Sequence, residues 1–239
     1  ERYSALLPFV SHRADLDYIL NEIVSESNAG HSYVDWGDFE KVKRVEGGLL
    51  GASLVPDPAA GRYRITGILK GENWNPARRS PLTENGVDVK EGDYLLRING
   101  KEVTLADNPY LFLENSAGKK VEITVSGKAD LKDPRSYTIK PITSELELMA
   151  FNWVEERRKM VDSLSGGRIG YIYVPNTSTD GNRELFRGMY AYHDKEALII
   201  DDRYNGGGFI PDRMADLLDR KTLVYWHRNG LTPETAPNI

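Results

Sequence analysis

Three consecutive glycines, Gly206 to Gly208, are the residues whose type and spacing point most directly to chemistry. They follow the apolar run 198–200 and the segment 201–205, and a helical pattern opens at Pro211. Glycine leaves the backbone N–H groups uncovered and adopts positive φ without strain. Between a strand and a helix N-terminus, such groups can point at a negative charge. That charge is either a phosphate or the oxyanion of acyl transfer, and a plain tight turn is the third interpretation.

The residues around the glycine run argue against a phosphate site. A P-loop needs Lys and then Ser or Thr after its last glycine, and no Lys follows Gly208. The dinucleotide fingerprint Gly-x-Gly-x-x-Gly needs a third glycine where this sequence has Pro211. We therefore expect no cofactor, and a nucleotide-binding domain is kept only as an alternative.

The spacing of the histidines does not favour a metal centre. The four histidines are dispersed and form no His-Glu-x-x-His pair: His12, His31, His193 and His227. Asp35 and Asp38 lie near His31 in the sequence, but a solvated acidic turn explains them better than a set of metal ligands does. We expect no metal site.

Acyl transfer needs a nucleophile, a base and oxyanion donors. The glycine run supplies donors, and His31 is the best candidate base because it follows Gly30 just past a helical pattern over 16–24. A structural or surface histidine is the alternative. No serine lies in a Gly-x-Ser-x-Gly elbow, and three serines that were considered lack any supporting context: Ser32, Ser165 and Ser178. The sequence thus contains a base and donors but no evident nucleophile.

A second loop with free N–H groups is formed by Gly48, Leu49, Leu50 and Gly51, directly before an expected strand. Successive N–H groups of this kind can capture a terminal carboxylate while the peptide adds a strand to the sheet edge. A helix predicted over 107–117 and capped by Asp107 would flank that site. An ordinary glycine turn is the alternative.

The elements that must position these loops follow from hydrophobic periodicity. Short alternating segments from Gly47 to Ile142 predict a β-rich module, with a hairpin at Asn99-Gly100. A capping box at Ser144 and Glu147 predicts the start of a long amphipathic helix with one apolar side. That side comprises Leu146, Met149, Trp153, Met160, Val161 and Leu164.

A βαβ unit is predicted after this helix, from a strand over 168–174, a helix around 185–190 and a strand over 197–201. Its two strands should be parallel neighbours. Ligands bind outside the carboxyl ends of such strands, which is where the glycine run falls.

Composition limits the possible partners. The chain has 239 residues, a net charge of −5, 40% hydrophobic residues and no Cys. The acidic balance argues against nucleic acid, and no apolar stretch is long enough for a membrane span. The sequence begins at Glu1 without Met and ends in a loop-like stretch, so we expect a piece of a longer chain.

These motifs together resemble a known family. Gly-Leu-Leu-Gly at 48–51, the segment 86–93 and Ile98-Asn99-Gly100 resemble a PDZ domain of the bacterial protease type. The segments 168–172 and 198–208 resemble the core of the C-terminal processing peptidases. The order of helical segment, PDZ domain and αβ core is similar to that of the tricorn protease family of serine peptidases.

This resemblance implies a mixed α+β fold in three parts. These are a helical segment (1–46), a PDZ domain (47–142) and an incomplete βαβ core of the ClpP/crotonase-like type (143–239). His31 would match the general base and Gly207 or Gly208 the oxyanion hole, while Gly206 and the loop 48–51 would bind substrate. The family has Ser before its base where this sequence has Gly30, which removes any accessory hydroxyl there.

The resemblance also implies that the nucleophilic Ser and an acidic partner follow Ile239, so the chain alone should be inactive. Its partners would be peptides or unfolded polypeptides, in a homo-oligomer. A cytoplasmic location is expected, with export to the periplasm as the alternative. A non-catalytic PDZ-type peptide-binding or assembly module is the second function to be tested.

Overall fold

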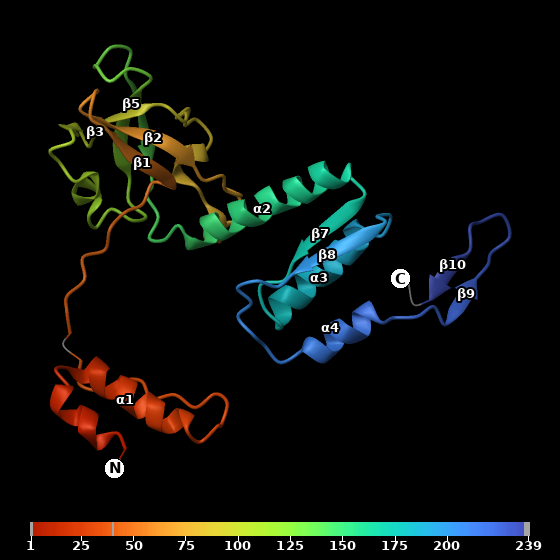
Figure 1. Ribbon diagram of the computed structural model, residues 1–239. Coiled ribbons are helices and arrows are strands. Elements are labelled where there is room, and N and C mark those ends of the chain that lie inside the picture. The colour runs from red at the N-terminus through yellow and green to blue at the C-terminus, as the bar shows by residue number, and fades with distance from the viewer. Residues whose placement is uncertain (1, 40, 237–239) are drawn as a thin grey trace. The chain divides into compact units, whose positions relative to one another are not determined.

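The computed structural model describes residues 2–39 and 41–236 and divides into two compact units, Glu1–Val45 and Glu46–Ile239 (Figure 1). The first unit contains the 3-10 helix η1 (Ser4–Phe9) and the helix α1 (Arg13–Ser25). A capping box starts α1, because the Asp15 carboxylate accepts the backbone N–H groups of Ser11 and His12 at 2.9 and 3.2 Å. The helix confirms the predicted periodicity and ends shortly before Gly30.

An antiparallel sheet forms the first part of the second unit, as the alternating segments predict. Its main strands are β1 (Ala52–Asp57), β2 (Arg62–Ile68), β3 (Tyr94–Ile98), β5 (Val121–Ser126) and β6 (Arg135–Ile139), in the order β1-β2-β3-β5-β6. The short strand β4 (Lys101–Glu102) pairs with β3. The turn between them is the predicted one, since Asn99 and Gly100 both have positive φ. Strand β1 lies at one edge of the order.

The sheet is held by a core of aliphatic side chains from its strands and from the segments that connect them. Ile65, Leu95, Ile98, Leu113 and Ile123 are all completely buried. Each such side chain contributes about 1.5–3 kcal/mol through the removal of apolar surface from water. The core of this module is therefore complete within the chain.

Short 3-10 helices connect the strands: η2 (Pro76–Arg78), η3 (Pro81–Thr83) and η4 (Pro109–Leu113). The helix predicted over 107–117 is wrong in length and in its cap. Only η4 forms, and Asn108 caps it by accepting the Tyr110 N–H at 3.1 Å. Asp107 instead accepts both the N–H and the hydroxyl of Thr104, because a carboxylate there closes the preceding turn.

The second part of this unit is the predicted βαβ arrangement. Helix α2 (Leu146–Ser165) leads into β7 (Ile169–Tyr173), α3 (Thr179–Ala191), β8 (Ala197–Asp201) and α4 (Pro211–Leu218). Strands β7 and β8 are parallel, with Ile169 opposite Ala197, which confirms the prediction. A small core forms around Ile172, Val174, Leu185, Met214 and Leu217.

Two predictions about α2 are corrected. The capping box does not form, because the Ser144 hydroxyl accepts the nearby Leu146 N–H at 3.2 Å and Glu145 becomes the cap residue. The predicted apolar side is also largely uncovered, since four of its members are exposed: Leu146, Met149, Met160 and Leu164. The buried residue of the first turn is Leu148, which the periodicity did not single out.

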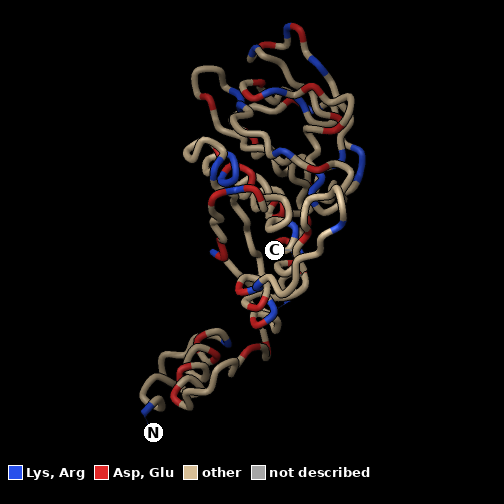
Figure 2. The backbone as a smooth tube through the Cα atoms, turned by 90° about the vertical axis from the view of Figure 1, so that its right-hand side faces the viewer, with Lys and Arg blue, Asp and Glu red and all other residues tan. Residues whose placement is uncertain are grey.

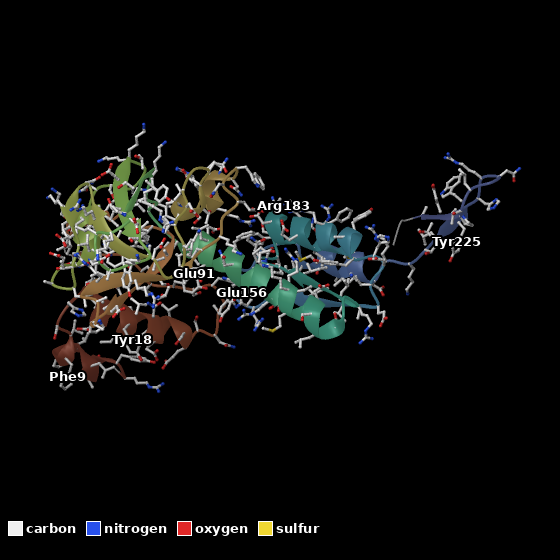
Figure 3. All side chains as sticks on the ribbon, turned by 90° about the horizontal axis from the view of Figure 1, so that it is seen from above. Phe9, Tyr18, Glu91, Glu156, Arg183 and Tyr225 are labelled. Carbon is white, nitrogen blue, oxygen red and sulfur yellow. The ribbon has the colours of Figure 1, made fainter. Side chains whose placement is uncertain are left out.

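The remaining strands, β9 (Val224–Trp226) and β10 (Glu234–Ala236), form an antiparallel pair on which Tyr225 is exposed (Figure 3). Acidic and basic residues are interspersed along the backbone (Figure 2). Many of them form local pairs, such as Arg135 with Asp93 at 2.6 Å. None of the helices in the described ranges is both long and apolar enough to cross a bilayer.

The sheet core predicts a clear difference between two leucines. Leu95→Ala should lower the free energy of unfolding by about 2–5 kcal/mol, because it leaves a cavity in the core. Leu111→Ala is the matched control, since Leu111 is 61% exposed in the same module, and it should change stability by less than about 0.5 kcal/mol. Urea unfolding followed by circular dichroism measures both, and equal losses would contradict this assignment of the core.

Candidate functional site

The loops that follow β7 and β8 are joined by backbone hydrogen bonds that extend the parallel pairing. We call residues 202–210 the glycine loop and residues 174–178 the β7 loop. The Gly206 N–H donates to the Pro175 carbonyl at 2.9 Å, and the Thr177 N–H donates to the Gly207 carbonyl at 2.9 Å. The Ile210 N–H then donates to the Thr177 carbonyl at 3.0 Å. The glycine loop is therefore fixed along its length by its neighbour.

The three glycines differ in what their N–H groups do. The Gly206 N–H is used in the bond to Pro175, and the Gly207 N–H donates to the Asn205 side-chain oxygen at 2.7 Å. Within the described chain, the Gly208 N–H has no acceptor. Among the three glycines, it is therefore Gly208 whose N–H group has no acceptor among the described residues.

Only Gly208 is confined by its surroundings. A Cβ atom there would lie 2.6 Å from the Ser178 backbone nitrogen and closer still to the Thr177 carbonyl group. Its φ of +154° is also one that other residues rarely adopt. At Gly206, by contrast, a Cβ would meet nothing closer than the Pro175 oxygen at 3.8 Å. Gly208 is thus required by the close approach of the two loops, whereas Gly206 is not.

Asn205 positions the glycine loop through both ends of its side-chain amide. Its nitrogen donates to the Val174 carbonyl at 3.1 Å, and its oxygen accepts the Gly207 N–H. The residue therefore links the glycine loop to the β7 loop. Asn205 is not among the site residues expected from the sequence, although an Asn directly before glycines is a signal for hydrogen bonding of its side chain to the backbone.

A buried carboxylate anchors the start of this loop. Asp201, at the end of β8, is 7% exposed and accepts the Tyr171 hydroxyl at 2.8 Å and the Arg203 Nε at 2.9 Å. The Arg203 side-chain hydrogen bonds hold the pKa of Asp201 far below its usual range. Burial and the bond to Asp201 raise the pKa of Tyr171 well above its ordinary value.

Arg203 also connects the loop to α2. Its guanidinium lies 5.0 Å from the ring centre of Trp153, a cation–π distance. The same ring meets Tyr173 of β7 at 5.3 Å and Tyr204 at 5.9 Å, both edge-on. The Arg-Tyr-Asn segment before the glycines thus serves to fix the loop against β7, β8 and α2.

His31 lies in the first unit, on the exposed loop that follows α1. Its Nδ1 is 3.5 Å from the Tyr33 hydroxyl, and its φ is +60°. Asn21 of α1 fixes this loop, since its side chain accepts the Val34 N–H at 2.8 Å and donates to the Val34 carbonyl at 2.7 Å. The only sequence signal for Asn21 is an Asn inside a helical pattern.

The serines considered from the sequence do not gain a catalytic context. The Ser165 hydroxyl is engaged with the backbone, since it accepts the Ile169 N–H at 3.2 Å. Ser178 is half-buried in the β7 loop, and Ser32 is exposed beside His31. Across the residues that the structure describes, no group of three His, Asp or Glu side chains could hold a metal ion.

The loop at 48–51 directs its N–H groups to several acceptors. The Gly48 N–H donates to the Leu113 carbonyl at 2.7 Å and the Leu49 N–H to the Ile142 carbonyl at 2.8 Å. The Gly51 N–H donates to a carboxylate oxygen of Glu145 at 2.7 Å. The N–H groups of Gly48 and Leu49 are therefore used within the backbone, and the one that binds a carboxylate is that of Gly51.

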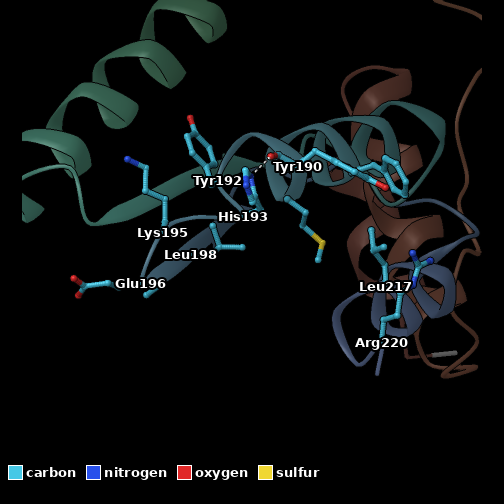
Figure 4. Close-up of a pocket in the computed structure, with 11 residues that line it drawn as sticks. Tyr190, Tyr192, His193, Lys195, Glu196, Leu198, Leu217 and Arg220 are labelled. Carbon is cyan, nitrogen blue, oxygen red and sulfur yellow. Dashed lines mark hydrogen bonds between the residues drawn. The ribbon is translucent and has the colours of Figure 1, made fainter. Parts of the chain in front are cut away.

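A cavity of about 550 Å³ lies elsewhere in the βαβ part (Figure 4). It is lined by the end of α3, the start of β8 and residues of α4, among them Phe186, Met189, Leu198 and Leu217. Because it opens at the amino end of β8, it is separate from the glycine loop at the carboxyl end. We assign it no part in the chemistry.

Comparison with known proteins gives consistent matches. Residues 48–144 match the family model described as the tricorn protease PDZ domain. The chain is 32% identical over 230 residues to a tricorn protease homolog of Saccharolobus solfataricus, covering 96% of this chain and 21% of that protein. It is 33% identical over 238 residues to tricorn protease homolog 1 of Streptomyces coelicolor, covering 99% of this chain and 22% of that protein.

A solved structure, the crystal structure of the tricorn protease, matches with a TM-score of 0.79 and 28% identity, over 99% of this chain and 23% of that one. The mixed fold with a PDZ-like sheet is thereby confirmed. The chain spans about a fifth of the length of the curated relatives it matches.

The Asp201 anchor predicts a pH-dependent contribution to stability. Asp201→Asn should lower the free energy of unfolding by about 2 kcal/mol at neutral pH, because it removes the negative charge that faces Arg203 and replaces one of the two acceptor oxygens by an NH₂ donor. The pKa of Asp201 in the folded protein lies below its value of about 3.9 in the unfolded chain. The contribution of Asp201 to the free energy of unfolding is therefore complete at a pH above that unfolded value, and it is lost as the pH falls through the folded pKa.

Urea unfolding at pH 7 and in steps below pH 4 measures this contribution. The gap between the wild type and Asp201→Asn should narrow on acidification. Asp202→Asn is the control, since Asp202 is an exposed neighbour, and it should follow the wild type throughout. A gap that stays constant down to low pH would contradict the anchor.

Proposed function

Because this chain is tricorn protease-like along its whole length, we propose that it supplies the general base and an oxyanion donor of a serine peptidase. The observation that carries the proposal is the Gly208 N–H, which has no acceptor within the described residues and sits on a loop fixed by its neighbour. A fixed, unpaired donor stabilises charge that develops in a transition state without having to reorganise.

In this proposal the reaction begins at His31. Its Nδ1 lies towards Tyr33, and in the tautomer that carries its hydrogen on Nδ1, Nε2 is free to take the proton of a serine hydroxyl. The serine oxygen then attacks the peptide carbonyl carbon, and the carbonyl oxygen becomes an oxyanion. The Gly208 N–H donates to that oxygen. When the oxyanion collapses, the C–N bond breaks and protonated His31 gives its proton to the leaving amine. A water molecule, deprotonated by His31, then hydrolyses the acyl-serine and restores the serine hydroxyl.

The proposed nucleophile is a serine outside residues 1–239, together with an acidic partner for the base. This is supported by the length of the relatives, of which the chain spans about a fifth. It is also supported by the settings of Ser32, Ser165 and Ser178 described above. The chain alone is accordingly expected to bind peptides without cleaving them.

Peptide binding is proposed for the PDZ-like sheet. Strand β1 lies at the edge of the strand order, so a peptide strand can add to it. The loop directly before β1 contains a backbone N–H, that of Gly51, which binds a carboxylate oxygen. The same observation favours the second candidate function, a peptide-binding or assembly module without catalysis.

Two glycine variants test the oxyanion donor. Gly208→Ala should lower kcat of the longer, nucleophile-containing protein by about a hundredfold or more, because the added methyl pushes the loop away from Thr177. Gly206→Ala adds the same methyl two residues away, where its nearest neighbour is the Pro175 oxygen at 3.8 Å, and should stay within about threefold of the wild type. A fluorogenic peptide assay measures both, and equal effects would argue against a special role for Gly208.

Two histidine variants test whether His31 is the general base. His31→Ala should reduce kcat by at least about a hundredfold, because no other group takes the proton from the nucleophile. His193→Ala is the control, since His193 is an exposed histidine of the βαβ part whose Nδ1 lies 3.0 Å from the Tyr190 carbonyl oxygen. Unchanged turnover in His31→Ala would exclude His31 as the base and favour the non-catalytic module.

A further inference from the structure

The chain places one of its own carboxylates on the loop proposed to receive a peptide's terminal carboxylate. The Gly51 N–H donates to Glu145 Oε1 at 2.7 Å, although the two residues are 94 positions apart. Glu145 is half-buried and directly precedes α2. A hydrogen bond to an ionised acceptor is roughly twice as strong as one between neutral groups.

The surroundings of Glu145 are those of the expected peptide site. Tyr110 belongs to η4, the helical turn that replaces the helix predicted to flank the groove. Burial raises the pKa of the Tyr110 hydroxyl, and the nearby negative charge of Glu145 raises it further. Glu145 therefore lies close both to the loop before β1 and to η4.

The first turns of α2 hold Glu145 in this position. Leu148 is 1% exposed, and its Cδ1 lies 3.6 Å from where a Cβ of Gly51 would be. One turn later, the Asn152 side chain accepts the Lys70 N–H at 2.9 Å and donates to the Lys70 carbonyl at 2.8 Å. Glu145 is thus presented by a helix that is docked on the sheet.

We propose that Glu145 is an internal competitor for the carboxylate site, which a peptide with a free C-terminal carboxylate must displace from Gly51. The inference rests on the peptide binding proposed above. Two carboxylates cannot share one N–H group without strong repulsion, so binding of the peptide and release of Glu145 are the same event. The fraction of molecules with Glu145 released sets the apparent affinity.

Helix α2 connects Glu145 to the glycine loop. Helix α2 begins one residue after Glu145, joins the sheet to β7 (Figure 1) and carries Trp153, on which Arg203 stacks. One helix therefore links the residue that a bound peptide displaces to the side chain on which Arg203 stacks.

Fluorescence anisotropy on the full chain tests the competition. The probe is a fluorescein-labelled pentapeptide, Ala-Ala-Leu-Ala-Ala, with a free carboxylate, and its C-terminally amidated form is the reference. Glu145→Gln keeps the size of the side chain but removes its charge, and it should tighten binding of the free-acid probe by about tenfold. Glu147→Gln removes an exposed charge two residues away and should leave binding unchanged.

A second readout follows the contact itself. In ¹H–¹⁵N spectra, the Gly51 amide should shift in Glu145→Gln and, in the wild type, on addition of the free-acid probe but not of the amidated one. Equal affinities of wild type and Glu145→Gln for the probe would overturn the competition while leaving peptide binding intact. Absence of probe binding to both proteins would overturn peptide binding and the competition together.

Discussion

The parallel pairing of β7 with β8 continues past the ends of both strands, and the geometry of the glycine loop depends on it. Backbone bonds between the two loops use the Gly206 N–H and the Gly207 carbonyl, so the loop has little freedom to move. This arrangement leaves the Gly208 N–H without an acceptor in the described structure and brings its Cα against Thr177. A donor prepared in this way needs no rearrangement when negative charge develops near it.

Charged and polar side chains attach this loop to the rest of its unit. Asp201 holds Arg203 at the strand end, and Arg203 in turn stacks on Trp153 of α2. The same N-terminal half of α2 is docked on the PDZ-like module through Leu148 and Asn152. One helix therefore contacts both the sheet proposed to bind peptides and the loop proposed to stabilise the oxyanion. A carboxylate, Asp201 or Glu145, is bound near each of these contacts because it finds a backbone or guanidinium donor there.

The elements of this fold could be predicted from periodicity and turn residues wherever local preference and burial agree. The hairpin at Asn99-Gly100 and the parallel pair β7–β8 are examples. The helix predicted over 107–117 was wrong, because Asp107 closes a turn with Thr104 and Asn108 takes the cap. The capping box at Ser144 was wrong for a related reason, since the Ser144 hydroxyl meets the nearer Leu146 N–H. Short polar side chains have several backbone partners within reach, and the sequence does not choose among them.

The sequence by itself determined which residue types are available: a glycine run after a strand, a histidine after a helix and a glycine-rich loop before a sheet. Those features follow from local preferences, since only glycine leaves its amide bare and reaches positive φ freely. Only the tertiary structure decided which amide is free. It distinguishes Gly208 from Gly206 because Pro175, the acceptor of the Gly206 N–H, reaches it only when β7 and β8 pair, whereas the Gly207 N–H is taken by the neighbouring Asn205 side chain. It also placed Glu145 on Gly51, because a contact between residues 94 positions apart depends on how the helix docks and leaves no periodic trace in the sequence.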